Sequence, residues 1–206
     1  TVALSTSTLV AGGGDDTISV SGGTYGLYGA SSIEAGAGND SIDISGVQYG
    51  IFGAATAPAV VNLGTGADTL HISGEVGIRS GVVQADGDAQ GDRITVSGIL
   101  HGVMESTLTL GEGKDTLIIE STGSGSGIGV RNSVIDASAG NAGDIISISS
   151  VGYTGMAGST LLADGGNNLI TVSSEKYTGM AGSTINLGEG RDTVTVEAKT
   201  FKFGMD

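Results

Sequence analysis

Aliphatic residues alternate with mostly polar residues in eight short stretches of this chain. Each stretch follows a glycine-rich turn and an aspartate, as in Gly36-Ala-Gly-Asn-Asp-Ser-Ile-Asp-Ile44. In every copy the second and fourth residues after the aspartate are aliphatic: Ile18/Val20, Ile42/Ile44, Leu70/Ile72, Ile94/Val96, Leu117/Ile119, Ile146/Ile148, Ile170/Val172 and Val194/Val196. A period of two predicts a β-strand that buries one face.

The turns recur at a nearly constant step. Their last residues are Asp16, Asp40, Asp68, Asp92, Asp115, Asp144, Asn168 and Asp192, which gives successive differences of 24, 28, 24, 23, 29, 24 and 24. Self-similarity at such a period is typical of stacked repeats. We therefore expect an all-β fold: a single parallel β-solenoid over residues 1–206, with about eight coils of about 24 residues.

Two further segments of each coil are predicted to be extended. A short apolar stretch precedes most turns, at Leu9–Ala11, Ile33–Ala35, Val61–Leu63, Leu108–Leu110, Leu161–Ala163 and Ile185–Leu187. An aromatic residue or histidine recurs about nine residues after the aspartate, at Tyr25, Tyr49, His101, Tyr153, Tyr177 and Phe201, followed by a large apolar residue at Tyr28, Phe52, Met104, Met156 and Met180. Each coil then has two to three short strands.

Composition excludes several classes of protein. The 206 residues include 39 glycines, one proline and no cysteine, and the net charge is −14. The absence of cysteine excludes disulfides, and eight scattered Lys and Arg residues argue against nucleic acid as a partner. No apolar run reaches the roughly 20 residues that span a bilayer. No signal peptide is recognisable and the chain does not begin with Met, so we expect it to be processed or excised.

The turn and the strand that follows it resemble the RTX (hemolysin-type) calcium-binding nonapeptide, Gly-Gly-x-Gly-x-Asp-x-apolar-x. The match is best at 36–40, 64–68, 111–115 and 188–192. The first glycine of the motif is replaced, for example by Ala35 and Leu63, and the motif occurs once per coil rather than at two edges. The resemblance implies export to a calcium-rich exterior, hence an extracellular or cell-surface location. It also implies Ca²⁺ held by Asp16, Asp40, Asp68, Asp92, Asp115, Asp144 and Asp192 with turn carbonyls near Gly12, Gly14, Gly36, Gly38, Gly64, Gly66, Gly111, Gly113, Gly188 and Gly190.

Electrostatics gives a separate reason to consider calcium. Stacked coils would place these aspartates in one column at about 4.8 Å, where neighbouring charges repel by roughly 1 kcal/mol even in water. Ca²⁺ accepts carboxylates and carbonyls flexibly. The alternative is that each aspartate only accepts hydrogen bonds from turn N–H groups, as Asx residues do in glycine turns. Asn168 favours that alternative because it keeps the acceptor and lacks the charge.

No pattern indicates catalysis. His71 and His101 are isolated, and the arginines at 79, 93, 131 and 191 occupy non-equivalent positions in their coils. We expect no enzyme activity. The recurrent tyrosines are compatible with packing at a corner of the solenoid or with a stripe that stacks on sugars.

We therefore expect a non-enzymatic, extracellular structural protein that associates with itself end to end. It would be a filament or surface-layer subunit or part of an adhesin stalk, and an excised piece of a longer repeat protein would show the same pattern. The alternative is a calcium-dependent module that binds a ligand such as a surface glycan. The repeat comes close to both termini, and uncovered solenoid ends are open to strand pairing. The residues expected to meet at the joint are Val2, Leu4, Phe201, Phe203 and Met205.

Overall fold

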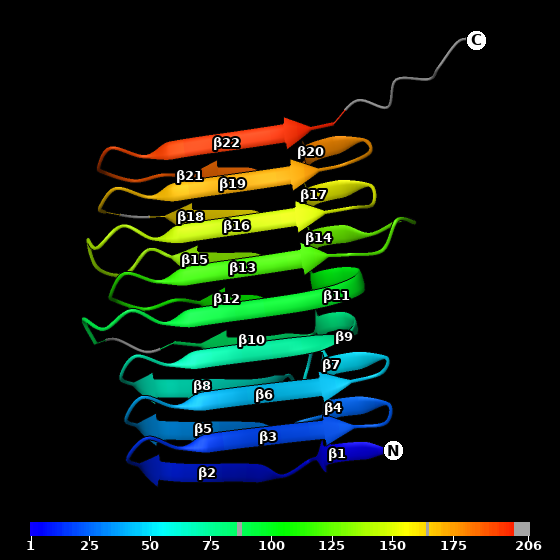
Figure 1. The fold of residues 1–206 in the computed structure, drawn as a ribbon, viewed down its shortest axis with the longest axis vertical. Coiled ribbons are helices and arrows are strands. Elements are labelled where there is room, and N and C mark those ends of the chain that lie inside the picture. The colour runs from blue at the N-terminus through cyan, green and yellow to red at the C-terminus, as the bar shows by residue number, and fades with distance from the viewer. Residues whose placement is uncertain (86–87, 164, 200–206) are drawn as a thin grey trace.

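Successive coils of the chain stack into a parallel β-solenoid of about eight turns, with about 24 residues between equivalent positions. The computed structural model describes residues 1–85, 88–163 and 165–199, and this part of the chain contains strands and no helix. Figure 1 shows the coils stacked along one long axis, with β1 to β3 at one end and β20 to β22 at the other. The predicted fold is confirmed.

The strand that precedes each Gly-Asp turn belongs to the first side of the solenoid. These strands form one eight-stranded parallel sheet. They are β2 (Thr8–Gly13), β5 (Ser32–Ala37), β8 (Ala59–Thr65), β10 (Gly81–Gln84), β12 (Thr107–Thr109), β15 (Val134–Ala137), β18 (Thr160–Ala163) and β21 (Thr184–Asn186).

The second side follows the turn, and the third side follows the second. Both belong to one fourteen-stranded sheet, because β9 (Thr69–Arg79) and β11 (Arg93–Met104) run unbroken from one side to the other. The other second-side strands are β3 (Thr17–Gly22), β6 (Ser41–Gly46), β13 (Thr116–Ser121), β16 (Ile145–Ser150), β19 (Leu169–Ser174) and β22 (Thr193–Ala198). The other third-side strands are β1 (Val2–Ser5), β4 (Tyr25–Tyr28), β7 (Tyr49–Phe52), β14 (Ile128–Arg131), β17 (Thr154–Ala157) and β20 (Thr178–Ala181).

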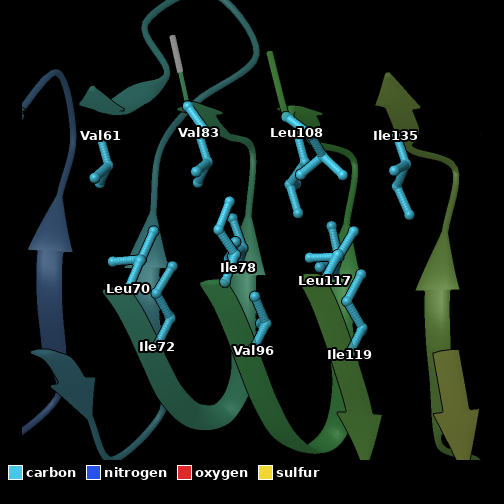
Figure 2. Packing of buried hydrophobic residues seen from close by; sticks show 14 of the residues in the cluster. Val61, Leu70, Ile72, Ile78, Val83, Val96, Leu108, Leu117, Ile119 and Ile135 are labelled. Atoms are coloured by element: carbon cyan, nitrogen blue, oxygen red, sulfur yellow. The ribbon is translucent and has the colours of Figure 1, made fainter. Parts of the chain in front are cut away.

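The core lies inside the coils and extends along the stack. The aliphatic residues of the second side and the apolar residues of the first belong to one core cluster, and Figure 2 shows Leu117 facing Leu108. Fourteen of the sixteen predicted inward positions are buried, and the remaining two, Val194 and Val196, lie on the last strand of the stack. Burial of one such side chain contributes roughly 1.5–3 kcal/mol, so the stack as a whole supplies the stability that one coil lacks.

The third side departs from the predicted alignment of its residues. Tyr25 and Tyr49 are in register with Val76, His101 and Ile128, whereas Thr154 and not Tyr153 continues this row. Met156 consequently pairs with Val130 and is fully buried, although Tyr28 and Phe52 point outward. A shift of one residue reverses the face in a β-strand, which explains the difference.

Two corners of the coil are shaped by small residues. Between the second and third sides, Gly22, Gly46, Gly74 and Gly98 lie against backbone, and a Cβ on Gly22 would come within 1.8 Å of the Tyr25 carbonyl oxygen. Between the third and first sides, buried and half-buried serines form a serine ladder, in which each hydroxyl oxygen accepts a hydrogen bond from an N–H group of the previous coil. The contacts run from Gly81 to Ser106, Ser133, Ser159 and Ser183 at 3.1 to 3.2 Å.

Candidate functional site

The corner between the first and second sides carries the predicted metal ligands. Two glycines in each well-formed turn have positive φ, for example 114° at Gly36 and 138° at Gly38. A Cβ on Gly36 would lie 1.8 Å from the carbonyl oxygen of Gly12 in the coil below. The stacking of the turns therefore requires these glycines whether or not a cation is bound.

The residue that ends each turn is aligned with its equivalents along the whole stack. The N–H of each one donates to Oδ1 of the next, from Asp16 to Asp40 and onward to Asp192, at 2.7 to 2.9 Å. We call this row, Asp16, Asp40, Asp68, Asp92, Asp115, Asp144, Asn168 and Asp192, the aspartate ladder. The structure thus aligns all seven predicted aspartates along one corner. From Asp40 onward each side chain accepts a bond from the neighbouring coil instead of bonding within its own turn.

The other carboxylate oxygen, Oδ2, does not accept these hydrogen bonds between coils. Oδ2 of Asp16, Asp40, Asp68 and Asp115 is buried without a hydrogen-bond partner among the described residues. Asp40, Asp68 and Asp115 are at most 2% exposed. Burial raises the pKa of Asp92 and of Asp115 to about 7, against the N–H bond that each accepts, and neighbouring aspartates raise it further. Burial likewise raises the pKa of Asp68 and Asp144.

These atoms provide a test of whether the corner suits a cation. Buried carboxylate oxygens without donors are the atoms that a proton or a hard cation would satisfy. Within the described ranges, however, no group of three or more His, Cys, Asp or Glu side chains is close enough to hold a metal ion. Any Ca²⁺ here would take one or two carboxylates and would depend on backbone carbonyls or water for its remaining ligands.

Near both ends of the stack, the residue before the ladder position forms further bonds between coils, in the opposite direction. Oδ1 of Asp15 accepts from the N–H of Asn39, and Oδ1 of Asn39 accepts from the N–H of Ala67, at 2.8 and 2.9 Å. Asn167 accepts from Arg191 in the same way. These bonds pair the N–H groups of Asn39, Ala67 and Arg191, so in these coils two consecutive residues at the end of the turn are hydrogen-bonded to a neighbouring coil.

The ends of the stack are the predicted surfaces for self-association. At the C-terminal end Val194 and Val196 are 37% and 48% exposed, whereas their neighbours Ile170 and Val172 in the coil below are fully buried. At the N-terminal end Val2 is 40% exposed, and Leu4 is half-buried against the core. Phe201, Phe203 and Met205 lie outside the described residues.

An aromatic surface covers the third side near the N-terminal end. Tyr25 stacks on Tyr49 with ring centroids 5.6 Å apart, and Tyr28 stacks on Phe52 at 5.8 Å. The Arg79 guanidinium lies 5.6 Å from the Phe52 ring centroid and pairs with Glu105 at 3.5 Å. Tyr153 and Tyr177 form a separate stack at 4.3 Å. The five recurrent aromatic and histidine positions among the described residues therefore do not make one continuous stripe.

The remaining candidates stay isolated. His101 Nδ1 is buried without a partner among the described residues, and burial with the charge of Arg131 lowers its pKa. His71 is on the exposed face of β9. No described helix is long and apolar enough to cross a membrane.

Comparison with protein-family models, with curated proteins and with solved structures found no match. The structure is a parallel β-solenoid compatible with a β-helix repeat protein, and the likeness to calcium-binding repeats rests on the turn residues alone.

Proposed function

We propose that this chain is a non-enzymatic structural protein of the cell exterior that associates end to end. It would act as a filament or surface-layer subunit or as part of an adhesin stalk. The observation that supports this proposal most is the pair of open ends. Val194 and Val196 continue core columns that are buried in every other described coil, yet within the described residues nothing covers them.

The flanks of the solenoid support the same proposal. Many acidic side chains point outward and are exposed, including Glu34, Asp43, Glu75, Glu120 and Glu175. The net charge of −14 disfavours contact between flanks. Strand edges and apolar ends favour association along the axis, and a contact between unlike ends that does not close produces a filament.

Electron microscopy of the intact chain over a range of concentrations tests the proposal. Samples with and without millimolar Ca²⁺ are examined in parallel. We expect unbranched filaments as wide as one solenoid. Particles that keep the length of a single subunit at every concentration would overturn it.

Calcium belongs to the proposal as a stabilising ion. It is supported by the buried Oδ2 atoms of Asp40, Asp68 and Asp115, which lack donors in the described part of the chain. The ion would neutralise the repulsion within the aspartate ladder, while the chain's own N–H groups continue to bind Oδ1.

A second candidate function is that of a glycan-binding module, favoured by the aromatic surface at Tyr25, Tyr28, Tyr49 and Phe52. Aromatic rings with polar edges suit contact with sugars. Titration of soluble polysaccharides, followed by tyrosine fluorescence, tests this candidate. Binding that is lost in Tyr28→Ala and kept in Tyr177→Ala supports it, and equal behaviour of the two variants contradicts it.

A further inference from the structure

The two ends of the aspartate ladder are complementary. Within the ladder, the backbone N–H of each residue from Asp16 to Asn168 donates to the side chain of the ladder residue in the next coil. The N–H of Asp192 has no acceptor among the described residues, which end at residue 199 and form no coil beyond β22. The Asp16 carboxylate receives no hydrogen bond from them, and its Oδ2 is buried. One end thus presents a donor and the other an acceptor.

Building on the end-to-end association proposed above, we propose that the joint between two copies continues this ladder. The N–H of Asp192 in one copy donates to the Asp16 carboxylate of a second copy. The direction of the bond is the one used at all seven steps inside the chain, and each of those steps is 2.7 to 2.9 Å.

The serine ladder has the same polarity. The N–H of Ser159 donates to the hydroxyl oxygen of Ser183 at 3.1 Å, and the N–H of Ser183 has no acceptor among the described residues. At the other end the Ser7 hydroxyl donates to the Ser5 carbonyl at 2.8 Å. Ser106, Ser133 and Ser159 make the same bond to the carbonyl two residues earlier, and each of these also accepts an N–H from the coil below. Ser7 is therefore oriented to accept the N–H of Ser183 from a second copy.

The strand edges fix the register that this pairing requires. On the second side, Thr17 and Ser41 begin an outward-facing column that ends with Leu169 and Thr193. If a second copy continues the stack, its Thr17 lies opposite Thr193 of the first copy. On the first side Thr160 lies opposite Thr184, and Thr8 lies opposite Ser32. In the joint β22 pairs with β3 and β21 with β2, both parallel. Val194 and Val196 then cover Ile18 and Val20 of the second copy, which makes the core continuous.

A substitution pair isolates the ladder bond. Asp16→Ala removes the acceptor, whereas Asp16→Asn keeps it, as Asn168 does within the chain. We expect Asp16→Ala to raise the concentration at which elongation begins by roughly 10- to 100-fold, because hydrogen bonds to charged groups have about that effect on an equilibrium. Asp16→Asn and the flank control Asp43→Ala should elongate like the unmodified chain. Melting below the elongation concentration verifies that each variant folds.

Introduced cysteines test the register directly, because the chain has none of its own. Adjacent strands place opposed residues within disulfide reach. Chains with Thr17→Cys and Thr193→Cys, or with Thr8→Cys and Thr184→Cys, should form disulfide-linked multimers on oxidation. The mixed pair of Thr17→Cys with Thr184→Cys uses the same exposed positions on different sides and should not.

The outcomes separate the two proposals. If the unmodified chain elongates but Asp16→Ala elongates equally well, or the mixed cysteine pair links as efficiently as the matched pairs, the ladder joint is wrong and end-to-end association remains. If the unmodified chain never elongates, both proposals fail.

Discussion

Acid should stabilise this protein, because the aspartate ladder holds its protons more tightly when folded. The pKa of Asp92 and Asp115 rises from 3.8 to about 7 in the fold, chiefly through burial. Between these values the folded chain binds more protons than the unfolded chain. The free energy of unfolding therefore falls as pH rises from about 4 to about 7. A carboxylate whose pKa is unchanged by folding would contribute no slope, and one whose pKa is lowered by folding would contribute the opposite slope.

The size of the effect follows from the two pKa values. A difference of about three pKa units at about 1.4 kcal/mol each gives on the order of 4 kcal/mol for one carboxyl. Whole domains are stable by only about 5–15 kcal/mol, so this loss is large. Asp92→Asn and Asp115→Asn keep an oxygen for the N–H bond and lose the titration. Each should be more stable than the unmodified chain at pH 7.5 and show a flatter pH dependence.

Chemical denaturation at half-unit intervals from pH 4 to pH 8, with a chelator present and below any elongation concentration, measures this slope. Asp43→Asn, on the exposed face of β6, serves as the matched control and should keep the slope of the unmodified chain. A stability that is constant or rises over this range would refute the reasoning, as would asparagine variants at positions 92 and 115 that leave the slope unchanged.

Three further predictions concern the strands, the serine ladder and calcium. Ile42→Asp should unfold the chain because it buries an unpaired carboxylate, whereas Ser41→Asp on the exposed face should leave the melting temperature within a few degrees; equal losses would contradict the strand phase. Ser133→Ala removes the acceptor of the Ser106 N–H and should cost about 1–3 kcal/mol in denaturant unfolding, compared with little for Ser19→Ala on an exposed face; similar values would deny the ladder a stabilising role. Millimolar Ca²⁺ should raise the melting temperature relative to a chelator at pH 7.5, and the double variant Asp40→Asn/Asp68→Asn should reduce that rise; identical melting in both conditions would leave hydrogen bonding as the sole role of the aspartates.

The repeating part of the fold was predictable because each coil repeats the same local rule. Alternating aliphatic residues such as Ile42 and Ile44 define the buried face, and the 24-residue step defines the stacking. Strands β10 and β15 were not predicted, since the sequences that follow them, at 86–92 and 138–144, lack the regular Gly-x-Gly-x-Asp pattern. The sequence pattern grouped Met156 with the outward residues Tyr28 and Phe52, whereas the structure pairs it with the inward residue Val130. The register of the third side shifts by one residue there, and the recurrence of tyrosine does not reveal that shift.

The candidate site was predictable in its residues but not in its bonds. The column of aspartates follows from the period. Which N–H each carboxylate accepts depends on the exact stacking of backbone in adjacent coils, and sequence spacing does not encode it. The serine ladder was missed, although Ser106, Ser133, Ser159 and Ser183 recur at steps close to the coil length and precede the first-side strands. That recurrence was the available signal.

X-ray fibre diffraction from aligned assemblies of the intact chain tests the central claim most directly. If subunits join end to end through continuous parallel strands, the strand spacing of about 4.8 Å must lie along the fibre axis. We expect a strong reflection at that spacing on the meridian. The same reflection on the equator would mean that the subunits associate through their flanks, and it would contradict axial assembly.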